Sequence, residues 1–192
     1  MHWLICKERT EIILFLFIWA NAFEERKEII FLSSNEDNWI IRDIMEIRTA
    51  TIADLAQIAA VEAECFPAAE AATKEEFAER IKYYGNHFWL MLEGEKLIAF
   101  VDGFVTDKPD LTDEMYERAE MHDENGAWQM IFGVNTIPAY RKHGYAGQLL
   151  QCAIEDARKQ GRKGLVLTCK EKLIAYYAKF GFENEGISES VH

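Results

Sequence analysis

The segment Arg141-Lys142-His143-Gly144-Tyr145-Ala146 decides how the rest of the sequence is interpreted. It lies between an apolar, strand-like stretch and a helical pattern whose apolar residues recur every three or four positions. The small residues Gly144 and Ala146 allow backbone N–H groups to approach an anion, and the N-terminus of a helix adds its dipole. The segment therefore predicts a cradle for a pyrophosphate, with Arg141 and Lys142 adding positive charge. The alternative is a tight strand-to-helix turn that carries two solvated basic residues.

Strands and helices are expected to alternate on both sides of this segment. Thr73 and Glu76 form a capping box that opens one helix, and Gly94 with Glu95 separates two strands as in a β-hairpin. We expect strands over residues 46–49, 88–93, 96–106, 128–136, 164–169 and 182–191. We expect helices over residues 51–65, 73–84, 144–160 and 171–180. This order predicts one α/β domain with right-handed βαβ crossovers.

The first 44 residues differ from the rest in their pattern of apolar and charged residues, so we expect an N-terminal appendage over residues 1–44 and the domain over residues 45–192. An apolar run covers residues 12–20, and a charged stretch covers residues 24–28. The run is about half the length needed to cross a bilayer. Its flanks imitate a secretion signal, although Glu8 and Glu11 interrupt the positively charged start. Two alternatives to a genuine appendage stay open: a secretion signal, and an overlong gene model in which Met45 is the true start.

The composition restricts the partners of the protein. A formal net charge of -12 repels phosphate backbones and anionic membrane surfaces, so we expect no nucleic acid and no membrane partner and favour a cationic substrate. The four cysteines form no CxxC pair, so neither a metal site nor a disulfide framework is indicated. A cytoplasmic location is the simplest interpretation. Cys65, Cys152 and Cys169 fit buried small hydrophobic positions.

Two separated motifs occur in an order that resembles a known enzyme family. The first is the RxxGxA segment from Arg141 to Ala146, and the second joins Leu167-Thr168-Cys169 to Tyr176-Tyr177-Ala178-Lys179-Phe180-Gly181-Phe182. Together they resemble the GCN5-related N-acetyltransferase (GNAT) family, most closely the branch that includes serotonin (arylalkylamine) N-acetyltransferase. The resemblance extends from Met45 to His192. It implies a fold with a central mixed β-sheet flanked by helices, and acetyl-CoA as the acetyl donor.

The resemblance also implies a set of cofactor-binding residues. The strands around Val134 and Leu167 should splay apart at a bulge, so that pantetheine inserts and takes backbone hydrogen bonds like an extra strand. Val134, Asn135 and Thr136 would face the pantetheine. The pyrophosphate would lie on Arg141, Lys142, His143, Gly144, Tyr145 and Ala146.

Tyr177 matches the family tyrosine that donates a proton to the leaving thiolate of CoA. A phenol with a reference pKa of about 10 stays protonated at neutral pH, and a thiolate of pKa about 8.5 accepts its proton readily. The alternative is that Tyr176 and Tyr177 are packing residues on a helix. Cys169 would be dispensable, because the resemblance implies direct attack in a ternary complex.

The general base is not assigned by the resemblance. Two histidines of serotonin N-acetyltransferase align with Met130 and Phe132, and neither side chain can titrate. Glu64, Glu70 and His122 are candidates, with exposed or capping roles as the alternative. The loop from Cys65 to Ala72 resembles a substrate wall, so the expected acceptor contacts are Phe66, Pro67, Glu70 and Phe132. The long acidic segment 107–126 could attract a cationic amine or be a solvated face.

The last strand of the family is missing from the end of the sequence. We therefore expect an exposed edge after the strand over 182–191, or an edge covered by the N-terminal segment or by a second copy in a homodimer. The predicted function is transfer of acetyl from acetyl-CoA to a primary amine, such as a small arylalkylamine or a polyamine. The alternatives are a non-catalytic CoA-binding or sensor module and a protein N-acetyltransferase.

Overall fold

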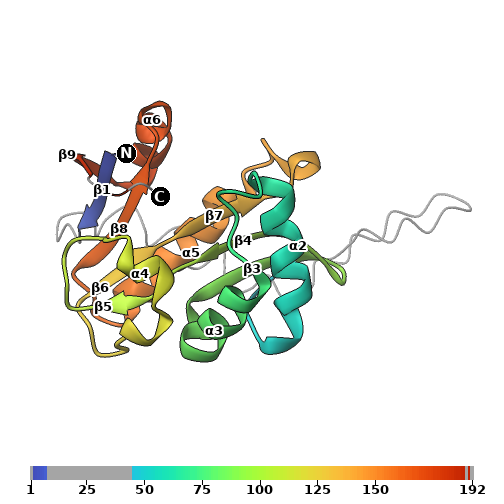
Figure 1. Cartoon of the computed structure of the whole chain (residues 1–192). Coiled ribbons are helices and arrows are strands. Elements are labelled where there is room, and N and C mark those ends of the chain that lie inside the picture. The colour runs from blue at the N-terminus through green and yellow to red at the C-terminus, as the bar shows by residue number, and fades with distance from the viewer. Residues whose placement is uncertain (1, 8–44, 189, 191–192) are drawn as a thin grey trace, which may run out of the picture. The chain divides into compact units, whose positions relative to one another are not determined.

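The computed structural model describes residues 2–7, 45–188 and 190, and these belong to one compact unit (Figure 1). The apolar run over 12–20 and the charged stretch over 24–28 lie outside the described residues. The described part of the chain contains no helix long and apolar enough to span a membrane.

The secondary structure follows the predicted alternation closely. The strands are β1 His2–Lys7, β2 Met45–Thr49, β3 Phe88–Glu93, β4 Lys96–Asp102, β5 Val105–Thr106, β6 Trp128–Ile131, β7 Gly133–Thr136, β8 Gly164–Cys169 and β9 Glu183–Ile187. The α-helices are α2 Leu55–Cys65, α3 Lys74–Tyr84, α4 Glu114–Glu117, α5 Tyr145–Lys159 and α6 Ile174–Tyr177. Short 3-10 helices are η1 Ile52–Asp54, η2 Gly85–His87, η3 Ala119–Met121, η4 Pro138–Tyr140, η5 Glu171–Leu173 and η6 Ala178–Phe180. The helix expected over 171–180 is therefore three short helical pieces.

The strands form two sheets that meet at Phe132. One sheet has the order β5-β6-β8-β1-β9, with β6 parallel to β8, and the other has the antiparallel order β2-β3-β4-β7. The single strand expected over 128–136 is thus two strands, because β6 pairs with β8 while β7 pairs with β4. The predicted α/β fold with mixed strand directions is confirmed, with a split in the sheet rather than one continuous sheet.

Strand β1 covers one edge of β9, and β9 itself is the outer strand of its sheet. Strand β1 lies between β8 and β9 and runs antiparallel to both (Figure 1). Its register with β8 extends from His2 opposite Cys169 to Lys7 opposite Gly164, and Leu4 is fully buried. The expected boundary at residue 44 is wrong for residues 2–7, because this strand belongs to the domain. Of the expected alternatives, the structure contains the one in which the N-terminal segment pairs with the strand expected over 182–191.

Helices cover opposite faces of the four-stranded sheet. On β4, Phe100 meets Phe77 of α3 with ring centroids 5.8 Å apart. On β3, Trp89 lies on the opposite face, because it is paired with Val101 rather than with Phe100, and its Nε1 donates to Asp156 of α5 over 2.8 Å. The α2–α3 layer and the α5 layer are therefore separated by the sheet. The predicted capping box of α3 is confirmed, because Glu76 N donates to Thr73 Oγ1 and Thr73 N donates to Glu76 Oε2.

Candidate functional site

The N-terminus of α5 has the geometry of an anion cradle. Gly144 caps the helix with φ of 86°, in the left-handed region that favours glycine, and Lys142 has φ of 69°. A Cβ on Gly144 would have no heavy atom within 4 Å, so the space above it is open. Within the described residues no side chain caps this helix. The first helical N–H bond is donated by Gln148 to Gly144 O, which leaves the N–H groups of the first turn free to meet an anion.

The loop before the helix is held in place by its own side chains. Arg141 Nε donates to Thr136 O over 3.0 Å, and the ring of His143 stacks on Tyr145 at 5.7 Å. Tyr140 donates a short hydrogen bond to Glu93. Arg141, Lys142 and His143 remain exposed. The structure therefore brings the predicted pyrophosphate residues together on one loop and helix start.

The split in the sheet lies directly before this loop. β6 stays paired with β8 as far as Ile131 opposite Leu167, and Phe132 N then donates to Asp102 O over 2.8 Å as the chain turns toward β4. β7 is the outer strand of its sheet, so one backbone edge is unpaired by any described strand. An extended ligand can add to such an edge as a strand does. That Val134, Asn135 and Thr136 face pantetheine stays a prediction.

Tyr177, at the end of α6, is buried. Its side chain is 7% exposed, and its ring packs at 5.2 Å from Tyr176 and 5.9 Å from Phe182. Burial raises the pKa of the Tyr177 hydroxyl well above its usual value, and nearby Cys169 and Tyr176 raise it further. The phenol is therefore a protonated donor at neutral pH. The segment that carries it packs against the first turn of α5, since Phe180 and Tyr176 lie at Gly147.

A buried polar cluster lies on the α2–α3 face of the split. Its charged members are Glu62 of α2, Arg80 of α3 and Asp102 at the end of β4, all buried. Glu62 accepts from Asn135 Nδ2 over 2.8 Å and from Ala72 N over 3.1 Å. Arg80 NH1 lies 3.5 Å from Asp102 Oδ2, and its NH2 donates to Tyr116 O. Sequence reasoning missed this cluster.

The predicted acceptor residues divide into two groups. Phe132 joins the cluster, with its ring 4.7 Å from Tyr116 and 5.7 Å from the Arg80 guanidinium. Phe66 is half-buried, whereas Pro67 and Glu70 are exposed in a turn in which Glu70 N donates to Pro67 O. The end of this loop reaches the cluster through Ala72. Glu64 is also exposed, so neither proposed glutamate base lies in the buried cluster.

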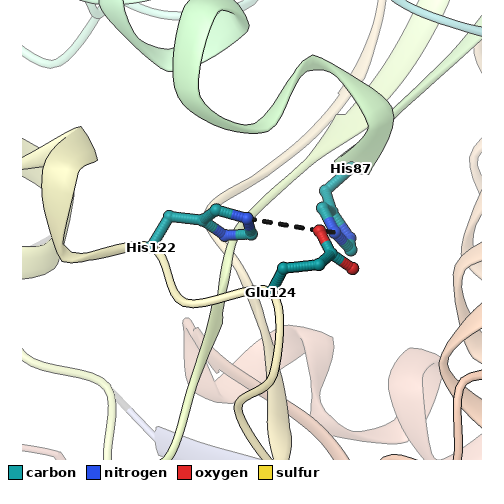
Figure 2. Close-up of side chains that lie close together, drawn as sticks. All are labelled: His87, His122 and Glu124. Carbon is teal, nitrogen blue, oxygen red and sulfur yellow. Dashed lines mark hydrogen bonds and ion pairs between the residues drawn. The ribbon is translucent and has the colours of Figure 1, made fainter.

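His122 has a different role from the one expected of a free base (Figure 2). His87 Nε2 lies 3.0 Å and His122 Nε2 lies 3.3 Å from the same oxygen of Glu124, and Arg162 binds the other oxygen over 2.8 Å. Burial lowers the pKa of His122, and neighbouring His87 lowers it further. Burial raises the pKa of Glu124, but hydrogen bonds from His87 and Asn86 outweigh burial and bring it to about 2.

The same three residues have the side-chain types of a zinc site, with ligand atoms within 4.8 Å of one another. A ligating Nε2 must offer a lone pair, so the proton of the neutral ring must lie on Nδ1. Val105 N–H, however, donates to His122 Nδ1 over 3.1 Å, which places the proton on Nε2. The charge of Arg162 also opposes a cation at this position. We interpret the cluster as a hydrogen-bonded anchor that holds the acidic segment against His87 of η2 and against Arg162, which precedes β8.

Comparison with known proteins gives consistent matches. The model of the acetyltransferase (GNAT) family matches residues 55–182. A similar solved structure is the loading GNATL domain of CurA from Lyngbya majuscula, with TM-score 0.61, 19% identity, and coverage of 70% of this chain and 69% of that chain. The GphF GNAT-like decarboxylase in complex with isobutyryl-CoA has TM-score 0.59 and 26% identity, and 71% of each chain is covered.

A GNAT family acetyltransferase from Brucella melitensis in complex with acetyl-CoA has TM-score 0.52 and 17% identity, with 78% of this chain and 92% of that chain covered. Identities at this level indicate a shared fold and leave the substrate open. No curated protein matches the sequence.

Proposed function

Because the chain belongs to the acetyltransferase (GNAT) family, we propose that it transfers an acetyl group from acetyl-CoA to a primary amine. The observation that carries this proposal is the position of the α5 N-terminus, which has Gly144 in the left-handed region and follows β7 in the chain. No described side chain caps this helix, and no described strand pairs with the outer edge of β7. This arrangement supports a pyrophosphate on the helix and an extended pantetheine along the strand. The open space at Gly144 fits the pyrophosphate.

The proposed chemistry is direct attack of a neutral amine on the thioester carbonyl. The C–N bond forms, the C–S bond breaks, and the departing thiolate takes a proton from Tyr177. The nitrogen loses one proton as the amide forms, and this proton restores the Tyr177 phenol. A covalent acetyl-cysteine is disfavoured, because burial raises the pKa of the Cys169 thiol and keeps it protonated. Tyr177 fits the donor role because burial keeps its hydroxyl protonated.

The proposed acceptor is a small arylalkylamine or a polyamine. The rings of Phe132 and Tyr116, 4.7 Å apart, could hold the apolar part of such an amine. The net charge of -12 favours a cation over a nucleic acid or an anionic membrane as partner.

One assay tests the donor, the reaction and the acceptor class together. The protein is incubated with acetyl-CoA and a panel of arylalkylamines, polyamines and peptide N-termini, while free CoA thiol is followed. Isobutyryl-CoA is included, because a structural neighbour binds it. Amine-dependent thiol release supports the proposal. Tight CoA binding without turnover on any amine would instead support the non-catalytic alternative.

A further inference from the structure

The buried cluster at the split has an unbalanced charge. Glu62 is 8% exposed, Arg80 is 7% exposed and Asp102 is 1% exposed, so all three groups are removed from water. Two carboxylates and one guanidinium leave one negative charge without a partner within this group. A buried charge is costly unless it is paired. The cluster must therefore hold an extra proton or receive a cation.

Arg80 is not placed to neutralise the carboxylates fully. Its contact with Asp102 is a single loose one of 3.5 Å, and its second nitrogen donates to Tyr116 O over 3.0 Å. The pKa of the Asp102 carboxyl is raised to about 7. Burial raises it most, Arg80 lowers it, and the nearby carboxylate of Glu62 raises it further. Burial also raises the pKa of Glu62, with Arg80 and hydrogen bonds from Ala72 and Asn135 acting against it.

Polar atoms converge above Gly133, the first residue of β7. A Cβ on Gly133 would lie 2.5 Å from Asp102 Oδ1 and 3.2 Å from Asn135 Nδ2, so only glycine lets these two polar groups approach the backbone of β7 this closely. Asn135 is 1% exposed, and its Oδ1 has no hydrogen-bond partner among the described residues. An ammonium group supplies three donors and one positive charge. It matches both the acceptor oxygens and the missing charge.

From this geometry we propose that the cluster binds the ammonium group of the acceptor and that Asp102 is the base that deprotonates it. This inference rests on the proposed function and deepens it. The ammonium proton moves to the Asp102 carboxylate, the nitrogen lone pair attacks the thioester carbonyl, and the C–S bond breaks as the thiolate takes the Tyr177 proton. The nitrogen then loses its second proton as the amide forms; this proton restores the Tyr177 phenol, and Asp102 releases its proton to water.

The test compares the pH dependence of kcat in the intact chain and in Asp102→Asn, which keeps the side-chain size. Wild-type kcat should rise with pH through an apparent pKa near 7, and the same limb should appear with two amines of different basicity, because it belongs to the enzyme. In Asp102→Asn, this limb should disappear and kcat should fall roughly 10² to 10⁴-fold. Acetyl-CoA affinity should not change.

A weakly basic acceptor that is already neutral at pH 7 should restore much of the lost rate, because it needs no base. Asp156→Asn is the matched control, since it makes the same chemical change on the α5 face of the sheet. If the apparent pKa of the rise in wild-type kcat shifts with the basicity of the amine, the assignment is overturned, even if Asp102→Asn fails to fold. An Asp102→Asn variant with full kcat and an unchanged pH dependence would also overturn the assignment. In either case, amine-dependent thiol release by the wild type would leave the proposed transferase function intact. Absence of turnover by the wild type on every amine would instead refute the transferase proposal itself.

Discussion

His2 lies directly opposite Cys169 in the antiparallel pair of β1 and β8. The second residue of the chain therefore sits at the carboxyl end of the strand that borders the split. Strand β1 therefore pairs with β9, the strand after which the family resemblance implies one more strand. Cleavage of a secretion signal or initiation at Met45 would each delete His2–Lys7 and remove this strand from the sheet.

Removal of the N-terminal strand should destabilise the domain. A chain starting at Met45 loses the partner of both β8 and β9 and the buried Leu4, so we expect aggregation or a large fall in melting temperature. The point change Leu4→Ala should cost about 2–5 kcal/mol of unfolding free energy, measured by urea denaturation. Ile187→Ala on neighbouring β9 is the control, because Ile187 is 82% exposed and should cost little. Unchanged melting of the truncated chain would contradict the placement of β1.

Local patterns predicted the elements but not their arrangement. The bounds of Phe88–Glu93 and Gly164–Cys169 were predicted from apolar runs between turn residues, because strand formation there depends on nearby residues. The insertion of β1 was one of several alternatives, since pairing between His2 and Cys169 depends on contacts that no local pattern encodes.

The same limit applies to the candidate site. The RxxGxA loop is contiguous in sequence and was predicted as a unit, whereas Glu62, Arg80 and Asp102 come from three separate elements. One signal for the cluster was available: Asp102 ends an otherwise apolar strand, Leu97 to Val101, and precedes Gly103. A carboxylate at the end of a buried strand is an unusual residue type for that position.

The cradle is tested at Gly144. Gly144→Glu adds bulk and negative charge above the α5 N-terminus, so acetyl-CoA binding measured by calorimetry should be lost. Gly161→Glu is a matched control: Gly161 has φ of 72° and open surroundings, but it follows the other end of α5. Both variants carry similar backbone strain. Equal affinities in the two folded variants would argue against a pyrophosphate at Gly144.

The raised pKa of Asp102 predicts the pH dependence of stability. For a carboxyl group whose folded pKa of about 7 exceeds the usual 3.8, the stabilising contribution is complete below 3.8 and is lost as pH rises through about 7. The unfolding free energy of the wild type, relative to Asp102→Asn, should therefore fall by a few kcal/mol between pH 4 and pH 8. Denaturant unfolding at several pH values checks this. A constant difference over the same range would mean that Arg80 holds the pKa of Asp102 low.

The anchor of the acidic segment is tested with zinc. If Glu124 accepts hydrogen bonds from His87 and His122, neither zinc addition nor chelation should change the melting temperature. Glu124→Gln should lower it, because the amide cannot accept from Arg162 and both histidines at once. Glu120→Gln, on an exposed side chain of the same segment, is the control. Stabilisation by stoichiometric zinc, lost in Glu124→Gln, would instead identify a metal site.

Tyr177→Phe tests the proposed proton donor, because it removes one hydroxyl and keeps the ring that packs on Tyr176 and Phe182. Without the phenol, the thiolate must leave unprotonated, so kcat should fall roughly 10² to 10⁴-fold while acetyl-CoA affinity changes little. A donor with a more acidic leaving thiol should narrow the gap between the variant and the wild type, since a better leaving group depends less on protonation. Tyr176→Phe is the control, because Tyr176 is only half-buried and lies on the same short helix. Full kcat in Tyr177→Phe under conditions where chemistry limits turnover, or a loss confined to Tyr176→Phe, would remove Tyr177 from the mechanism.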